Sequence, residues 1–361
     1  MRAREGDLIE TGNRVIFDVK GLVHPPDKVI AFPRYIPSAA GTRGRGSALY
    51  GKVYNLQERF RYLQQNAPQL IVQDPVFGEM LCEVPASAVT RHHQPVEKLA
   101  ALRRAKKPAG LEAKAIALAE TLKEAAGIPW NSIGISGSVM AGLFTAQSDI
   151  DPLVYGAENC CRVYAALQKL LKDEGSRFKP YTQEELQVLF DFRSKDTAMP
   201  FEDFVRVEQR KAFQGKYDGT DFFVRFVKDW SEFTERYGDI QYSNCGYVKI
   251  AATLADDAEA LFTPCTYHIE EVEVLEGPTL QPITEVTSFR GRFCAFPTTI
   301  YGEPTTIEAQ GKVELVTDTR TDKQHYRLLL GNKPTDYMII RQPKKSLTFS
   351  SQWRTTENQK G

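Results

Sequence analysis

The sequence has no long hydrophobic run, no excess of charge of either sign and no CxxC pair of cysteines. No stretch approaches the roughly 18 uninterrupted apolar residues that a membrane-spanning helix needs, and the first residues lack the apolar core of a signal peptide. We therefore expect a cytoplasmic protein without a membrane partner. Neither the six cysteines nor the five histidines show metal-ligand spacing, so a zinc cage and a disulfide framework are not predicted.

Charge is balanced over the 361 residues, because 46 lysines and arginines face 46 aspartates and glutamates. A neutral chain cannot coat nucleic acid by its overall charge, so a nucleic-acid partner must be held by local basic clusters. The remaining composition is that of a globular protein, with 42% hydrophobic, 11% aromatic and 25% charged residues. Length and composition together predict two or three domains.

The N-terminal quarter of the chain alternates short β-type stretches with turns rich in glycine and proline. This pattern predicts a small β-rich domain over 1–90, with one helix near 56–65 and a mobile glycine- and serine-rich loop at 38–47. Residues 91–110 are interpreted as a basic linker. Its lysines and arginines either form a solvated helix face or contact phosphates.

The pattern changes twice more along the chain. Strand and helix patterns alternate over 111–237 and indicate a core with a mixed sheet. From 238 to 341 β-type patterns dominate and predict a C-terminal β-barrel-like domain that includes a strand over 290–296. The polar residues 342–361 are expected to be a disordered tail. The predicted fold class is therefore α+β, with a mixed-sheet core between two β-rich domains.

The most informative stretch lies in the core segment, where an apolar run at 132–136 leads into Gly137 and Ser138. A strand followed there by a short helix presents backbone N–H groups and a hydroxyl to a phosphate, although Gly-Ser pairs are also common in turns. After ten intervening residues come Asp149 and Asp151 at the start of an apolar strand. Because side chains two apart on a strand share a face, both carboxylates can bind Mg²⁺. An isolated Asp-x-Asp would instead indicate a charged strand edge or turn.

Four residues carry a resemblance to a known family: Gly137, Ser138, Asp149 and Asp151. Their order and spacing resemble the fingerprint of the DNA polymerase beta-like nucleotidyltransferase superfamily, which has an apolar strand, Gly-Ser or Gly-Gly, about ten residues and then Asp-x-Asp. The resemblance covers about 111–227 and is strongest to the minimal nucleotidyltransferase domains of archaea and bacteria. It implies a polymerase beta-like core for this segment.

The resemblance also implies a third carboxylate on a later strand, and Asp221, which opens an apolar strand after a glycine turn, is the best candidate. A cap at the start of that strand is its alternative interpretation. Two Mg²⁺ ions would bridge the triphosphate of an NTP and Asp149, Asp151 and Asp221, with Asp221 helping to activate the acceptor hydroxyl. Pro152 departs from the family pattern, because proline offers no N–H to a sheet ladder.

The resemblance implies that the protein transfers a nucleotidyl group from an NTP to a hydroxyl. It also implies that Gly137 and Ser138 bind the β- and γ-phosphates of the NTP. Arg206 and Arg210 share a face of a helix predicted over 201–213 and either contact triphosphate or nucleic-acid phosphates or form a solvated, salt-bridged face. Two extra domains suggest a bulky acceptor, and we expect the 3′ end of an RNA such as a tRNA. The alternatives are a protein side chain or small metabolite as acceptor, or a silent nucleotide- or RNA-binding protein.

Overall fold

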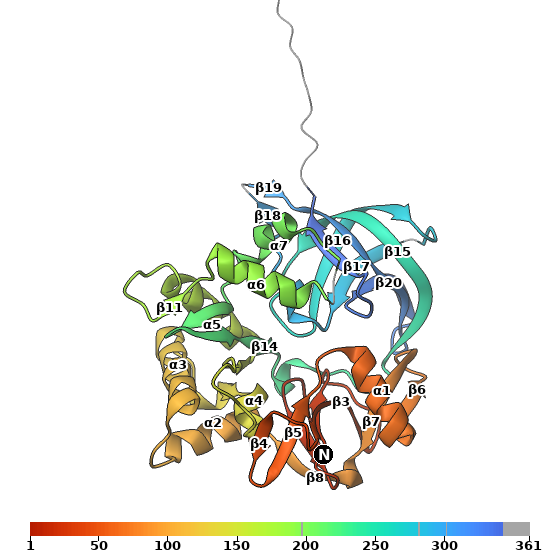
Figure 1. Cartoon of the computed structure of the whole chain (residues 1–361). Coiled ribbons are helices and arrows are strands. Elements are labelled where there is room, and N and C mark those ends of the chain that lie inside the picture. The colour runs from red at the N-terminus through yellow and green to blue at the C-terminus, as the bar shows by residue number, and fades with distance from the viewer. Residues whose placement is uncertain (196–197, 281, 301, 342–361) are drawn as a thin grey trace, which may run out of the picture.

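Three bodies of secondary structure make up the chain: an N-terminal sheet, a central unit with two small sheets, and a C-terminal ring of strands (Figure 1). The computed structural model describes residues 1–195, 198–280, 282–300 and 302–341. It confirms a mixed α/β protein with β-rich ends. The tail predicted over 342–361 lies outside the described residues.

The N-terminal domain is an eight-stranded antiparallel sheet with one helix. Its strands are β1 (Leu8–Thr11), β2 (Ile16–Val19), β3 (Lys28–Pro37), β4 (Arg43–Arg45), β5 (Ala48–Lys52), β6 (Ile71–Asp74), β7 (Glu79–Pro85) and β8 (Val89–His93). The predicted helix is α1 (Leu56–Asn66), which Asn55 caps by accepting a hydrogen bond from the backbone N–H of Glu58. The segment predicted as a loop at 38–47 differs, because β4 forms a hairpin with β5.

The predicted linker at 91–110 is packed rather than extended. Its first three residues continue β8, which pairs with β1, and α2 (Pro95–Arg104) buries Leu99 and Leu102 in the core that α3 (Gly110–Ala126) also covers. Most of the basic side chains of this segment are exposed, and of these Arg103 and Arg104 belong to α2. The segment therefore belongs to both neighbouring domains.

The central unit contains the predicted mixed sheet, in which β10 (Pro152–Tyr155) pairs antiparallel with β9 (Ile133–Ile135) and parallel with β14 (Arg225–Val227). A second small sheet joins β11 (Phe178–Lys179), β12 (Gln214–Tyr217) and β13 (Thr220–Phe223). The helices of the unit are α4 (Gly137–Ala141), α5 (Ala157–Leu170), α6 (Gln183–Arg193) and α7 (Phe201–Glu208), in addition to α2 and α3. The apolar strand that is predicted to open at Asp221 is thus divided at Val224 between two sheets, as β13 and β14.

The C-terminal domain is built on β15 (Ile240–Asp256), β16 (Cys265–Glu276), β17 (Ile283–Ser288), β20 (Thr306–Asp318), β21 (Lys323–Leu330) and β22 (Tyr337–Ile340). Pairing of β15 with both β16 and β20 closes five of these strands into a barrel-like ring. The short strands β18 (Thr299–Ile300) and β19 (Glu303–Pro304) form a separate hairpin. The prediction of a strand over 290–296 is wrong, because Gly291–Phe293 form a 3₁₀ turn and Ala295 has a positive φ of 56°.

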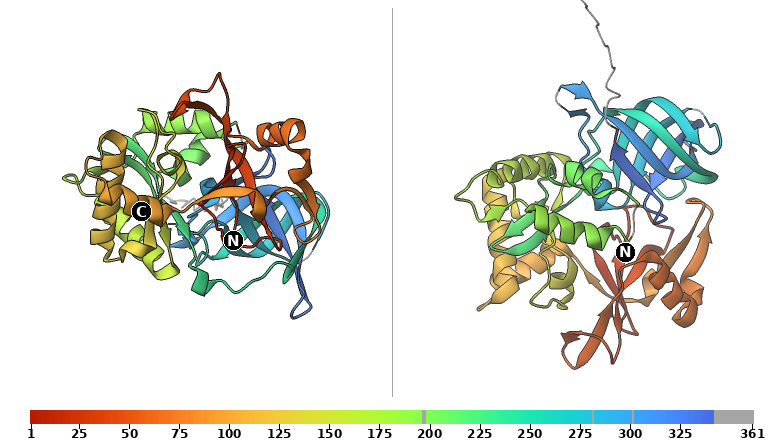
Figure 2. Two further views of the ribbon diagram at one scale, coloured as in Figure 1. Left: turned by 90° about the horizontal axis from the view of Figure 1, so that it is seen from below. Right: turned by 45° about the horizontal axis from the view of Figure 1, so that its top comes forward.

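Further 3₁₀ turns lie at Pro68–Leu70, Ala86–Ala88, Trp130–Ser132 and Trp230–Glu232. In both views of Figure 2 the N-terminal domain lies beside the central unit and the ring of strands. Tyr35 and Tyr50 of the N-terminal sheet pack on Met140 and Leu143 around α4. No helix in the described ranges combines the length and apolar character needed to cross a lipid bilayer.

Candidate functional site

The Asp-x-Asp segment lies between α4 and β10, against the N-terminal domain. Ile150 is fully buried and bridges to Phe222 in the parallel direction, so the alternation of an extended chain turns Asp149 and Asp151 the opposite way. Both aspartates line a narrow pocket of about 60 Å³ together with Gly137. Three of the four residues that carry the family resemblance are thus adjacent in space.

Gly137 allows the close approach of the Asp151 carboxylate. Its φ is +60°, and a Cβ added there would lie 1.8 Å from Asp151 Oδ2. Two further contacts fix the same corner: the Ser136 backbone N–H donates to the Asp151 carbonyl (2.8 Å), and the Ser136 hydroxyl donates to the Gly6 carbonyl of the N-terminal domain (2.6 Å). The glycine of the motif therefore has a steric reason, since any side chain would displace a carboxylate.

Ser138 is buried beside this corner and does not line the pocket, in contrast to Ser136. Its hydroxyl has no hydrogen-bond partner within the described part of the chain. A buried hydroxyl of this kind commonly serves a ligand or water. The role predicted for Ser138 in binding phosphate stays a prediction.

The pocket concentrates negative charge away from water. Burial raises the pKa of Asp151 to about 7, and the neighbouring charge of Asp149 adds to this rise. Lys52, Arg225 and Arg34 oppose it. Two carboxylates so placed repel each other, and a bound cation would relieve the repulsion.

Pro152 begins β10 and pairs with Ile135 of β9. On the other side of the strand, the parallel pairing is made by Ile150 with Phe222 and then by Leu153 with Arg225, and Pro152 takes no part in it. The proline therefore lies at the first position of a strand, where its missing N–H is tolerated.

Asp221 is adjacent to the aspartate pair through the backbone, because the Ile150 N–H donates to the Asp221 carbonyl (2.9 Å). Its side chain is half exposed, does not line the pocket and forms an ion pair with Lys216 (Nζ to Oδ1, 3.0 Å). Burial raises the pKa of Tyr181, and the negative charges of Asp221 and Asp149 add to this rise. Tyr181 thus lies within electrostatic reach of both carboxylates.

The oxygen donors fit a single Mg²⁺ better than two. Asp149 and Asp151 face the pocket, and Mg²⁺ is commonly held by one or two carboxylates plus waters and substrate phosphates. Among the residues that the structure describes, no three or more His, Cys, Asp or Glu side chains are grouped so that they could hold a metal ion together. A second ion would need Asp221 to leave Lys216.

Arg206 and Arg210 lie apart from the pocket lining. Helix α7 packs against α6 and β22. Arg206 pairs with Asp203 (2.8 Å), and the Arg210 Nε donates to the Arg206 carbonyl (3.2 Å) just beyond the helix. The ion pair favours the salt-bridged interpretation for Arg206, and contact with phosphate stays a prediction for both.

Sequence reasoning missed the contribution of the N-terminal domain. Asp18, Arg34, Tyr35 and Lys52 all line the pocket from β2, β3 and β5. The charges of Lys20 and Arg59 hold the pKa of Asp18 well below its usual range, although burial opposes this. No motif spacing links these residues to the Asp-x-Asp segment, so only the tertiary fold brings them together.

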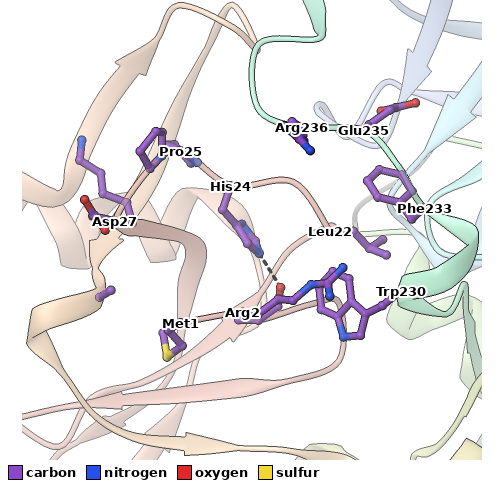
Figure 3. A pocket seen from close by; sticks show the side chains of 14 residues that line it. Met1, Arg2, Leu22, His24, Pro25, Asp27, Trp230, Phe233, Glu235 and Arg236 are labelled. Carbon is purple, nitrogen blue, oxygen red and sulfur yellow. Dashed lines mark hydrogen bonds between the residues drawn. The ribbon is translucent and has the colours of Figure 1, made fainter.

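A larger hollow of about 460 Å³ opens between the N-terminal residues and the segment after β14 (Figure 3). Trp230 and Phe233 form one side, and the Arg2 guanidinium lies 3.9 Å from the centre of the Trp230 ring. His24 donates from Nε2 to the Ala3 carbonyl (2.9 Å) and accepts at Nδ1 from the Ile30 N–H (3.2 Å). The lining of this hollow mixes acidic and basic side chains, and it contains no pair of carboxylates like that of the smaller pocket.

The chain is similar to a protein from an archaeon. It is 29% identical over 340 residues to the uncharacterized protein MJ1086 of Methanocaldococcus jannaschii, and the alignment covers 92% of this chain and 96% of that protein. No family model and no solved structure matches the chain. The similarity extends over all three bodies of the fold.

Proposed function

We propose that the protein is a cytoplasmic, Mg²⁺-dependent nucleotidyltransferase with a polymerase beta-like core, which transfers a nucleotidyl group from an NTP to a hydroxyl. The observation that carries the proposal is the corner formed by Gly137, Asp149 and Asp151. The carboxylates of Asp149 and Asp151 line one pocket, and the approach of Asp151 leaves no room for a side chain at Gly137. This arrangement supports cation binding beside a site open to phosphate.

In this reaction the acceptor oxygen forms a bond to the α-phosphorus, and the bond from that phosphorus to the bridging oxygen of pyrophosphate breaks. Bound Mg²⁺ would supply neutralisation of the charge on the phosphates. Asp149 and Asp151 hold the cation, and Gly137 keeps space for the carboxylate of Asp151. The resemblance gives Ser138 a part in holding the β- and γ-phosphates.

Asp221 takes the proton of the acceptor hydroxyl in this proposal. Its carboxylate pairs with Lys216 through Oδ1 and also forms a side-chain hydrogen bond with Tyr181, so it must release one of these contacts to accept the proton. A third carboxylate that turns toward the pocket would also allow a second Mg²⁺. The ion pair with Lys216 is the observation that favours the second candidate function, a silent nucleotide-binding protein whose third acid is occupied.

For the acceptor we propose the 3′ end of an RNA such as a tRNA. Support comes from the exposed Arg103 and Arg104 at the end of α2. Contact of Arg206 and Arg210 with the phosphates of the acceptor belongs to the same proposal. A protein side chain or a small metabolite is the alternative acceptor.

The test is to incubate the purified full chain with each α-labelled NTP, Mg²⁺ and total RNA, and to measure both the labelled product and the pyrophosphate released. We expect labelled RNA with one or more NTPs. Asp149→Ala and Asp151→Ala should abolish transfer and keep the fold, because each removes like-charge repulsion. Glu174→Ala, at an exposed acid outside the pocket, is the control and should keep full activity.

Two results would contradict the proposal. Wild-type turnover by either aspartate variant would remove the catalytic assignment. Nucleotide binding by the wild type without label in any acceptor or pyrophosphate release would favour the silent binding protein.

A further inference from the structure

The pocket that holds the two aspartates also receives two cationic side chains from the N-terminal domain. Arg34 comes from β3 and Lys52 from the end of β5. Both line the same pocket as the Asp149 and Asp151 carboxylates. In the described ranges neither side chain forms an ion pair with an acidic residue.

Other cations around the same pocket are already paired. Arg225 pairs with Glu5 (2.8 Å), and Lys20 pairs with Asp18 (2.9 Å) and Glu5 (3.2 Å). Pairing of this kind makes a cation part of the protein's own charge balance and leaves less of its charge for a ligand. Arg34 and Lys52 are therefore the two cations of this pocket that are best able to bind an anion.

These two side chains are held at the junction between the N-terminal domain and the central unit. Arg34 donates from Nη1 to the Val53 carbonyl (3.1 Å), and its guanidinium lies 5.1 Å from the centre of the Tyr54 ring. The Lys52 ammonium lies 4.8 Å from the same ring. Tyr54 in turn packs edge to face on Phe192 of α6, with ring centres 5.8 Å apart. This exposed aromatic pair joins the segment that carries the two cations to α6.

We propose that Arg34 and Lys52 bind the β- and γ-phosphates of the NTP, so that the N-terminal domain completes the substrate site. This inference rests on the proposed function. One Mg²⁺ leaves a nucleoside triphosphate with net negative charge, which the aspartates would repel and the cations attract. A guanidinium can bind phosphate oxygens through two parallel hydrogen bonds, and an ammonium acts as a point charge.

The test measures binding without turnover. Isothermal titration calorimetry of the full chain with Mg²⁺ and inorganic tripolyphosphate, and then with each NTP, gives the affinities. We expect Arg34→Gln and Lys52→Gln each to weaken binding by about tenfold to a hundredfold, as for the loss of one hydrogen bond to a charged group. The loss should be smaller for nucleoside monophosphates. Arg61→Gln, on the exposed side of α1, is the matched control and should bind like the wild type.

A second pair of variants separates charge from structure. Arg34→Lys and Lys52→Arg keep the positive charge and should recover most of the affinity, whereas a role in the fold alone predicts no recovery and overturns the inference. Equal affinity of the wild type and both glutamine variants also overturns it and leaves the proposed function intact. A wild type that neither binds tripolyphosphate or NTP nor transfers label overturns both.

Discussion

Gly137 begins helix α4 and Gly142 follows its last residue, and both have a left-handed backbone but different neighbours. Gly137 has φ +60° and Gly142 has φ +68°. A Cβ at Gly137 would meet the Asp151 carboxylate at 1.8 Å, whereas one at Gly142 would approach only the Arg45 side chain, at 3.7 Å. The pair separates the cost of the backbone conformation from the cost of the steric clash.

We expect Gly142→Ala to lower the free energy of unfolding by about 1–2 kcal/mol, the usual cost of a left-handed non-glycine residue. Gly137→Ala should cost more, because Asp151 must also move, and should abolish Mg²⁺-dependent transfer. Thermal unfolding and the transfer assay on both variants check this. Equal activity of the two variants would show that the position of Asp151 does not depend on Gly137.

His24 gives the stability a defined pH dependence. Burial lowers its pKa to about 4, although the hydrogen bond to Ala3 opposes this (Figure 3). Because the pKa is lower in the folded than in the unfolded chain, the unfolded chain binds more protons between about pH 4 and 6.5. The free energy of unfolding should therefore fall by up to about 3 kcal/mol as the pH decreases through this interval.

The measurement is the free energy of unfolding in urea from pH 7 to pH 4 for the wild type and His24→Gln. The difference between the two should shrink or change sign toward low pH, since glutamine takes up no proton. His268→Gln, at an exposed histidine, should keep the wild-type pH dependence. Parallel curves for the wild type and His24→Gln would show that the pKa of His24 is not lowered by folding.

At the scale of elements, the β4–β5 hairpin reaches from the N-terminal domain to the loop before Asp149. Arg43 Nη1 donates to the Leu143 carbonyl (2.7 Å) and to the Ser148 hydroxyl (3.3 Å), and Ser148 accepts from the Thr145 N–H (2.9 Å). The hairpin thus holds both ends of the connection between α4 and the aspartate pair.

Arg43→Gln should loosen this connection. Loss of hydrogen bonds from a charged donor, at about 1.5–3 kcal/mol each, predicts amide exchange in 143–148 that is roughly tenfold to a hundredfold faster. Hydrogen exchange followed by mass spectrometry checks this, with Arg61→Gln as the control. Unchanged exchange in 143–148 would mean that the loop is held by its own contacts.

Sequence patterns predict the elements whose periodicity is strong. A helix is predicted over 111–126 because its apolar residues recur at helical spacing and Gly127 and Pro129 follow it, and α3 spans Gly110–Ala126. The β4 strand escapes prediction because its Arg-Gly-Arg sequence has no apolar alternation. It forms through pairing with β5 and through hydrogen bonds to residues far along the chain.

The candidate site is predictable to the same extent. The two-residue period of a strand is enough to place Asp149 and Asp151 together, and the structure brings Gly137 to them. Arg34 and Lys52 carry no such signal, because their place in the pocket depends on how one domain packs on another. The division of the predicted strand at Val224 likewise depends on a partner, since the Val224 N–H donates to the Phe213 carbonyl (2.7 Å).

At the scale of the whole molecule, the formal net charge is zero, so any RNA must be bound by local clusters of basic side chains. If RNA is the acceptor, Arg206→Glu combined with Arg210→Glu should weaken binding and flatten its salt dependence, by about one unit of log–log slope for each phosphate that the variant no longer neutralises. Binding measured across a salt series checks this. Lys169→Glu combined with Lys172→Glu, which changes exposed lysines at the end of α5, is the control of equal charge change. A weak and flat curve for the wild type would favour a protein or small-molecule acceptor.

The ion pair between Glu5 and Arg225 joins positions 220 residues apart in the chain. At about 5–20 residues per second, ribosomes need on the order of ten to forty seconds to synthesise that interval. Through that time Glu5 lacks this arginine, although Lys20, with which it also pairs, is already made. Leu153, which a Cβ at Gly6 would meet, is made within the same interval. The charge pairing around Glu5 is therefore completed only when β14, the last strand of the central sheet, has been made.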